Sequence, residues 1–221
     1  MLMQKERELI VSYGKLMSSN GLSPGTSGNL SIFDRDTGLM AISPSGIGYF
    51  DTQTEDVVIM KLDGTIVDGT RKPSSEWGLH AAFYMKKADI GAIVHNHAIY
   101  CTTFAVLNEP IKAVHYVIGD AGADTIPCAP YRTFGTPGLA EAAVECCGES
   151  KAVLLANHGI VVCGADMDSA FSLARNLEYV AELQYRAMCI GKPNILTSAQ
   201  MADAVKRFGT YGQGDSSKNG Y

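Results

Sequence analysis

Three of the five histidines follow apolar segments of the kind that form buried strands. His95 and His97 close the segment 91–97, and His158 follows residues 153–156. Because side chains at positions i and i+2 of a strand share a face, both imidazoles of the pair can reach one ion. A catalytic zinc takes three protein ligands and keeps a further position open. Taken singly, each histidine is equally well explained by a strand end or a hydrogen-bonded turn; together they favour a metal-dependent enzyme.

Glu76 follows two serines at the expected start of a helix that extends through Lys87, with Ser74 or Ser75 as its N-cap. An acid in the first turn interacts favourably with the helix dipole, and this common role is the simpler explanation of Glu76. The alternative is a general base, which must lie within hydrogen-bond reach of a substrate proton. His80, one turn further along, is interpreted as a packing residue rather than a ligand.

Hydroxyl and glycine residues recur in short segments that precede expected strands or helices. Each segment is an ordinary turn by itself, but hydroxyls and free amides at a helix start also form a phosphate cradle. None resembles a Walker loop or a dinucleotide fingerprint. The segments are Thr26-Ser27-Gly28-Asn29, Ser45-Gly46 and Ser74-Ser75.

The elements that must position these residues alternate between strand-like and helical patterns, as in a mixed α/β protein. Strands are expected at 30–33, 39–42, 57–62, 65–67, 91–97, 153–156 and 160–163. Helices are expected at 9–17, 74–87, 98–107, 137–147, 166–190 and 198–208. Neither a repeat nor a linker is evident, so we expect one domain over residues 1–212 and a flexible C-terminal tail over 213–221.

The composition restricts the class of protein. Of the 221 residues 46% are apolar, which argues against disorder, and the net charge of −5 without a basic run argues against a nucleic-acid partner. The charged start does not resemble a signal peptide, and no apolar run reaches membrane-spanning length. The six cysteines form no Cys-x-x-Cys pair. We therefore expect a cytoplasmic protein with reduced thiols and no membrane partner.

Several motifs together resemble the class II aldolase/adducin family. They are Gly25-Thr26-Ser27-Gly28-Asn29-Leu30-Ser31, Pro73-Ser74-Ser75-Glu76, Val94-His95-Asn96-His97-Ala98 and Asn157-His158-Gly159. Within the family, the segments 126–131, 133–136 and 208–212 are similar to bacterial L-fuculose-1-phosphate aldolases. The match extends in order from about residue 5 to residue 212. It implies a three-layer α/β/α fold with a mixed, largely antiparallel central sheet.

The resemblance also implies a set of roles. His95, His97 and His158 would bind one Zn²⁺ per subunit, with Glu76 as a fourth ligand that leaves the metal to act as acid and base. Tyr116 and Tyr211 match tyrosines that contribute to catalysis, Tyr116 from a neighbouring subunit, because the family forms homotetramers with sites at subunit interfaces. The positions that match the substrate and phosphate site are Thr26, Gly28, Asn29, Ser45, Gly46, Ser74 and Ser75.

The implied activity is zinc-dependent, reversible retro-aldol cleavage of a ketose 1-phosphate. The expected substrate, a small phosphorylated sugar, is L-fuculose 1-phosphate, cleaved to dihydroxyacetone phosphate and L-lactaldehyde. The alternatives are a pentulose-5-phosphate 4-epimerase, a related dehydratase of a thioribulose phosphate, and a non-catalytic interaction module like the adducin head. Arg71-Lys72 before Pro73, and a tail rich in Gly, Ser and Asn, depart from the family pattern and bear on the aldehyde end of the substrate.

Overall fold

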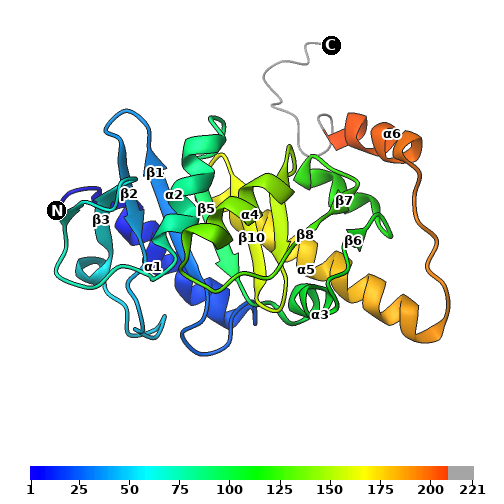
Figure 1. The fold of residues 1–221 in the computed structure, drawn as a ribbon, viewed down its shortest axis with the longest axis horizontal. Helices are drawn as coiled ribbons and strands as arrows, with labels where there is room; N and C mark the ends of the chain where they lie inside the picture. The colour runs from blue at the N-terminus through cyan, green and yellow to red at the C-terminus, as the bar shows by residue number, and fades with distance from the viewer. Residues whose placement is uncertain (209–221) are drawn as a thin grey trace, which may run out of the picture.

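The computed structural model describes residues 1–208, and its centre is an eight-stranded sheet (Figure 1). The strand order is β4-β3-β2-β1-β5-β10-β9-β8. Neighbouring strands are antiparallel, except that β8 and β9 run parallel. The strands are β1 (Asn29–Asp34), β2 (Leu39–Ile42), β3 (Val58–Lys61), β4 (Ile66–Asp68), β5 (Ala92–Asn96), β8 (Cys128–Ala129), β9 (Ala152–Leu155) and β10 (Gly159–Gly164). A separate two-stranded sheet pairs β6 (Ile111–Lys112) with β7 (Thr125–Ile126).

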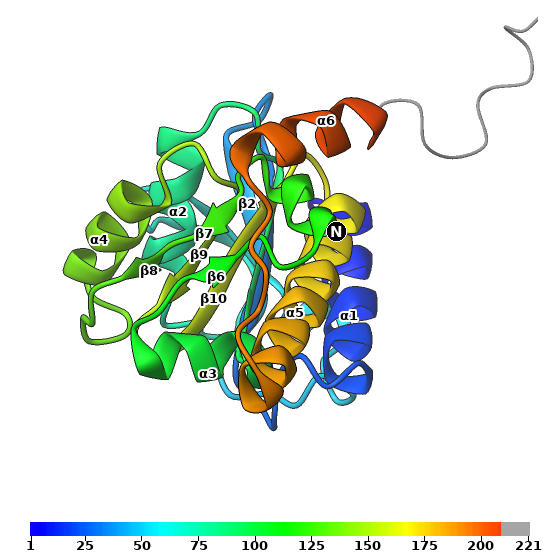
Figure 2. The same cartoon turned by 90° about the vertical axis from the view of Figure 1, so that its right-hand side faces the viewer.

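Helices cover both faces of the large sheet, so the predicted three-layer α/β/α fold is confirmed. Figure 2 shows the sheet nearly edge-on, with α2 and α4 on one side and α1 and α5 on the other. The helices are α1 (Gln4–Ser19), α2 (Trp77–Lys86), α3 (Ile99–Leu107), α4 (Pro137–Cys147), α5 (Met167–Ile190) and α6 (Ser198–Phe208). Two 3₁₀ helices, η1 (Thr54–Asp56) and η2 (Tyr116–Ala121), complete the described chain.

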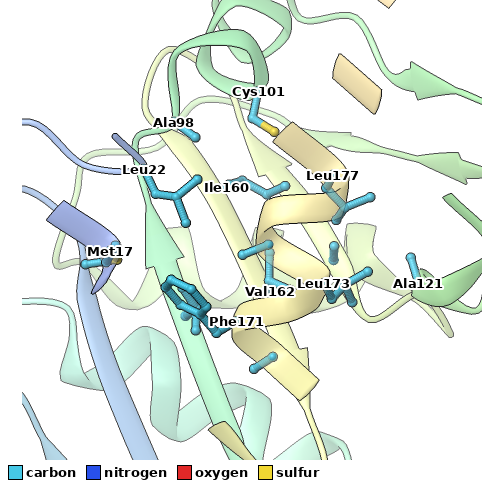
Figure 3. Packing of buried hydrophobic residues seen from close by; sticks show 14 of the residues in the cluster. Met17, Leu22, Ala98, Cys101, Ala121, Ile160, Val162, Phe171, Leu173 and Leu177 are labelled. Carbon is cyan, nitrogen blue, oxygen red and sulfur yellow. The ribbon is translucent and has the colours of Figure 1, made fainter. Parts of the chain in front are cut away.

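Two apolar cores lie against the two faces of the sheet, as the alternation of side chains along each strand requires. On β5, Ala92 and Val94 join the core under α1 and α5, whereas Ile93 joins the core under α2 and α4. In Figure 3, Leu173 and Leu177 of α5 lie beside β10 in the first of these cores. Residues at odd positions of β5, including His95, therefore face the α2 and α4 layer.

The sequence predicted the long elements within a few residues. One prediction was wrong: the second helix begins at Trp77 with Glu76 at the N-cap, so neither Ser74 nor Ser75 caps it. Instead, the Ser74 hydroxyl accepts from the Glu76 amide in the turn before the helix (3.2 Å). The short strands β6, β7 and β8 and both 3₁₀ helices were not predicted, because elements of two to six residues are too short to show a clear period.

The strands expected at 57–62 and 65–67 are present as the antiparallel pair β3 and β4, with Gly64 at a φ of 93° in the turn between them. The expected domain boundary at residue 212 and Tyr211 both lie outside the described residues. All six cysteines are free thiols, at residues 101, 128, 146, 147, 163 and 189. Within residues 1–208, none of the helices combines the length and the apolar character needed to span a membrane.

Candidate active site

Strand pairing brings the three histidines to one end of the sheet. In the antiparallel register of β1 and β5, Asn29 lies opposite His95, and β10 pairs with the other edge of β5. His158 lies in the tight turn that joins β9 to β10, where Asn157 adopts a left-handed conformation with φ 56°. Asparagine tolerates this conformation better than most residues, which explains the Asn-His-Gly turn.

The three imidazoles converge on one point. The Nε2 atoms of His95 and His97 are 3.2 Å apart, and the ring centroids of all three histidines are 4.8–5.0 Å from one another. One ligand atom from each of them lies within 4.8 Å of the others. His95 is fully buried, while His97 and His158 are partly exposed.

Glu76 closes this group from the start of α2. Its Oε2 lies 3.1 Å from Nε2 of His95, and its Oε1 lies 3.5 Å from Nε2 of His158. The Glu76 side chain makes no cap hydrogen bond with its own helix, and the residue is 6% exposed. The carboxylate is therefore turned toward the histidines, which does not fit the simpler interpretation of Glu76 as a helix-start acid.

The donor set fits a divalent cation. Nδ1 of His95 donates to the Ile160 carbonyl (3.0 Å), which leaves Nε2 as the lone-pair nitrogen in a neutral ring. Four ligands about 2.0–2.1 Å from a tetrahedral zinc are about 3.3–3.4 Å from one another, close to the spacings among His95, His97 and Glu76. Oε1 of Glu76 is buried and has no hydrogen-bond partner in residues 1–208, as expected of an atom that needs a cation.

Burial and charge act against each other on these groups. When no metal is bound, His95 can take a second proton on Nε2; burial opposes the ionised form of Glu76, but the charge of this protonated His95 and the hydrogen bonds from His95 and Asn29 hold the pKa of the carboxyl well below its usual range. Burial likewise opposes the charged form of His95, but Glu76 raises the pKa of that ring. Burial and the neighbouring His95 lower the pKa of His97 and of His158 to about 4. At neutral pH His97 and His158 are thus uncharged, as metal ligands must be.

The hydroxyl and glycine loops meet beside the histidines because backbone hydrogen bonds join two of them. The Ser45 amide donates to the Lys72 carbonyl (2.9 Å), and the Ser74 amide donates to the Ser43 carbonyl (3.0 Å). The third loop packs against β5 through Gly28, which has a φ of 77°. A Cβ at Gly28 would lie 2.6 Å from the His95 carbonyl oxygen, so no larger residue fits there.

The loops, His97 and His158 line one cavity of about 330 Å³. Of the predicted site residues, Thr26, Gly28, Asn29, Ser45, Gly46, Ser74, Ser75, Glu76, His97 and His158 contribute to its wall. Residues without a predicted role contribute as well: Asn157, Tyr131, Arg132 and Phe134. The segment 126–136 carried a resemblance to known proteins but no periodicity or charge pattern from which a role could be assigned.

Asn29 differs from the other predicted phosphate residues because both ends of its side chain are already bonded. Its Nδ2 donates to Oε2 of Glu76 (3.1 Å), and its Oδ1 lies 2.5 Å from Nε2 of His80. His80 is fully buried, and burial and the nearby His95 lower the pKa of its ring to about 3. Asn29 therefore links Glu76 to a buried histidine that the sequence suggested only for packing.

Tyr116 lies apart from this cavity. Within residues 1–208, the residues that line the cavity do not include it; it begins η2, is 49% exposed and stacks on His115 at 4.5 Å. A second hollow contains Tyr116 together with Asp120, Asn176 and Phe208. The structure thus does not bring Tyr116 to the histidines of its own subunit.

Comparison with known proteins gives concordant matches. Residues 8–185 match the model of the class II aldolase and adducin N-terminal domain. The 5-deoxy-D-ribulose 1-phosphate aldolase of Bacillus thuringiensis serovar kurstaki is 49% identical over 213 residues, covering 96% of this chain and 100% of that protein. The L-fuculose phosphate aldolase of Escherichia coli K12 is 39% identical over 197 residues, covering 89% and 90%. A solved L-fuculose 1-phosphate aldolase is 39% identical with a TM-score of 0.92, covering 95% and 98%.

Proposed function

Since the chain belongs to the class II aldolase and adducin family, we propose that it is a zinc-dependent aldolase that reversibly cleaves a ketose 1-phosphate. The observation that supports this most is the position of Glu76, which faces three converging histidines at the wall of a cavity that the hydroxyl loops also line. A non-catalytic interaction module has no need of such an arrangement.

His95, His97 and His158 would hold the zinc ion, with Glu76 as a fourth ligand before substrate binds. A bound zinc ion would supply Lewis-acid stabilisation of the negative charge that develops on the ketose oxygens. No lysine is then required to form a Schiff base with the ketose. Glu76 is the group that would move a proton, because its carboxylate lies at the cavity wall beside the three histidines.

The reaction balances with one proton lost and one gained. The bond between C3 and C4 of the ketose breaks, and the C4 hydroxyl loses its proton as that carbon becomes the aldehyde. The electron pair remains on the three-carbon fragment, which takes up a proton at C3 and leaves as dihydroxyacetone phosphate. Glu76 would deliver the proton at C3. The phenol of Tyr116 from a neighbouring subunit would form a hydrogen bond that orients the oxygen of the departing aldehyde.

The substrate phosphate would bind to hydroxyls and amides of the three loops. Ser75, Ser45 and Thr26 are exposed at the cavity, and Ser75 lies two residues before the start of α2. Backbone amides near a helix start favour an anion. Arg132 also lines the cavity and adds one positive charge, so the cradle is not wholly neutral.

The relatives suggest two candidate ketoses, 5-deoxyribulose 1-phosphate and L-fuculose 1-phosphate. Both end in a methyl group; removing dihydroxyacetone phosphate leaves acetaldehyde from the first and L-lactaldehyde from the second. The exposed rings of Tyr131 and Phe134 at the cavity offer apolar contacts to such an end. The higher identity to the first relative makes 5-deoxyribulose 1-phosphate the better candidate.

Product analysis with both ketoses tests this function. Triose phosphate should appear with an equal amount of aldehyde, activity should vanish after chelation, and zinc should restore it. An inverted pentulose phosphate without aldehyde release would identify an epimerase, and a dehydrated product a dehydratase. Full activity of metal-free protein, or a protein that neither binds metal nor turns over any ketose, would contradict the proposal.

The assembly we propose is a cytoplasmic homotetramer in which Tyr116 reaches a neighbouring site; Tyr211 would contribute from the segment beyond residue 208. Exposure of Tyr116 outside its own cavity supports an intersubunit role. Mixing Tyr116→Phe chains with Glu76→Gln chains should give hybrids in which some sites hold both wild-type groups and regain activity. Hybrid assembly without any recovered activity would place Tyr116 outside the chemistry.

A further inference from the structure

A row of buried polar side chains leads from Glu76 into the layer between the sheet and α2. Asn29 and Ser31 extend from β1, and His80 and Tyr84 extend from successive turns of α2. Nδ1 of His80 lies 2.6 Å from the Ser31 hydroxyl, which in turn lies 2.8 Å from the Tyr84 hydroxyl. Each of these four residues is at most 4% exposed. An apolar residue could fill this layer, so a wholly buried imidazole there calls for a reason beyond packing.

The chemistry of the groups fixes the direction of the hydrogen bonds. The Glu76 carboxylate only accepts, so the Asn29 amide must turn its Nδ2 toward Oε2. The Oδ1 of Asn29 then faces His80, and Nε2 of His80 must carry the hydrogen. In a neutral ring Nδ1 then accepts from the Ser31 hydroxyl. The histidine is therefore the donor that determines which way the Asn29 amide points.

The orientation of this amide matters on two sides. If Asn29 turned over, Oδ1 would face the Glu76 carboxylate, and two acceptors would repel each other. The Asn29 nitrogen also carries a second hydrogen at the wall of the cavity, where we place the substrate phosphate. A turned amide would thus present oxygen both to the base and to the phosphate.

We propose that His80 is a positioning residue that locks the Asn29 amide, so that Asn29 holds Glu76 and presents an N–H to the substrate. This inference rests on the proposed function of Glu76. His80 itself does not line the cavity within residues 1–208, and acts through Asn29 alone. The remaining members, Ser31 and Tyr84, hold the ring in the tautomer that donates from Nε2.

Two substitutions at the same position separate positioning from packing. In His80→Gln the amide nitrogen can reach the place of Nε2 and donate to Asn29, whereas His80→Leu fills space without a donor. We expect kcat to fall about tenfold to a hundredfold in His80→Leu, because Asn29 then loses its hydrogen bond to the charged Glu76, and to stay within about threefold of wild type in His80→Gln. Phe83→Leu, in the core on the same helix, is the matched control and should lower Tm without changing kcat.

The effect of His80→Leu on kcat should disappear in a Glu76→Gln chain, because without the carboxylate the amide orientation no longer affects a base, whereas its effect on KM through the phosphate should remain. Losses in kcat that simply multiply in the double variant would show a general structural defect and would overturn the inference. Equal kcat values for His80→Gln and His80→Leu would overturn it as well. If instead Glu76→Gln alone leaves turnover unchanged, the proposed function fails, and the two failures are distinguishable.

The protonation of the His80 ring can also be measured without following turnover. Nitrogen-15 NMR of the histidine rings, assigned by the signals lost in His80→Gln, reports which ring nitrogen carries the hydrogen. The inference predicts that Nε2 of His80 is protonated and Nδ1 is not. A ring protonated at Nδ1 alone would accept from Asn29 and reverse the amide, which would contradict the inference even if every variant folded poorly.

Discussion

The same strands bury different kinds of side chain on their two faces. Toward α1 and α5, β1 and β5 present Leu30, Ala92 and Val94 to an apolar core. Toward α2 and α4, Ile93 joins a second apolar core, but the same strands also present Asn29, Ser31 and His95, which are equally buried and are bonded to α2 or face Glu76. The period of two along a strand allows one face to stabilise the fold while the other holds the chemistry. The polar face tolerates burial because nearly every group on it has a partner.

The contrast between the two faces would be wrong if the polar face contributed only to stability. Glu76→Gln tests this, and we expect it to have the largest effect on turnover. The substitution keeps the shape and the bond from Asn29 but removes the basicity. Turnover should fall by about 10²–10⁴-fold, as for the loss of a general acid–base group, with Tm little changed. Steady-state kinetics on the ketose phosphate measure this, with the exposed Glu145→Gln on α4 as the control. A loss below about tenfold would return Glu76 to a structural role.

The apolar face should show the opposite behaviour. Leu177→Ala removes a fully buried side chain under α5 and should lower the free energy of unfolding by about 2–5 kcal/mol, leaving kcat nearly unchanged. Leu155→Ala lies on the α2 and α4 face shortly before His158 and should lower both quantities. Urea unfolding and kinetics on the same samples measure the pair. Equal kinetic losses in both would show that the two faces are not separable.

Substitutions in the proposed phosphate site, at the edge of the polar face, should have a smaller effect on the kinetics. Ser75→Ala removes one hydroxyl from the cavity, and KM for the phosphorylated ketose should rise about 10–100-fold, as for a hydrogen bond to a charged group. The unphosphorylated ketose should be almost unaffected. Arg132→Gln compares the contribution of a full charge at the same wall. A similar loss with both ketoses would argue against a phosphate at Ser75.

The last prediction concerns the dependence of stability on pH that His80 introduces. Its pKa in the folded protein is about 3, below the value of an exposed histidine, so between these values the unfolded chain binds the extra proton. Stability is then complete above about pH 6.5 and is lost as the pH falls toward 3, by up to about 1.4 kcal/mol per pH unit. Chelated wild-type protein should therefore lose stability more steeply than His80→Gln between pH 6 and pH 4, roughly by that slope. If the free energy of unfolding of both proteins changed equally with pH, His80 would not be a buried, uncharged histidine in the folded protein.

The sequence predicted what depends on local pattern. Periodicity located β5 and α5, and the spacing of His95 and His97 placed both on one face of a strand. It could not predict that β10 pairs with β5, although this pairing brings His158 to the other two histidines. The pattern of three strand-end histidines suggested a shared metal site without this pairing, and family resemblance supplied the metal-ligand and acid–base role of Glu76.

The remaining features of the site depend on contacts between distant segments. The role of His80 became visible only through its bond to Asn29, which lies 51 residues earlier in the chain. Tyr131, Arg132 and Phe134 reach the cavity from a loop whose residues show no period. The N-cap predicted at Ser74 or Ser75 was wrong for a related reason. The preference for serine at an N-cap describes an isolated helix, whereas here Glu76 takes the N-cap position and its side chain contacts His95.

The exchange of carbon-bound hydrogen in dihydroxyacetone phosphate tests the central claim most directly, since it needs neither an aldehyde nor the identity of the ketose. In deuterium oxide, the zinc-loaded protein should replace one hydrogen at the hydroxymethyl carbon, as followed by proton NMR. The chelated protein and Glu76→Gln should exchange at least about a hundredfold more slowly. Exchange at the wild-type rate in Glu76→Gln, or after zinc is removed, would contradict a metal-assisted proton transfer by Glu76.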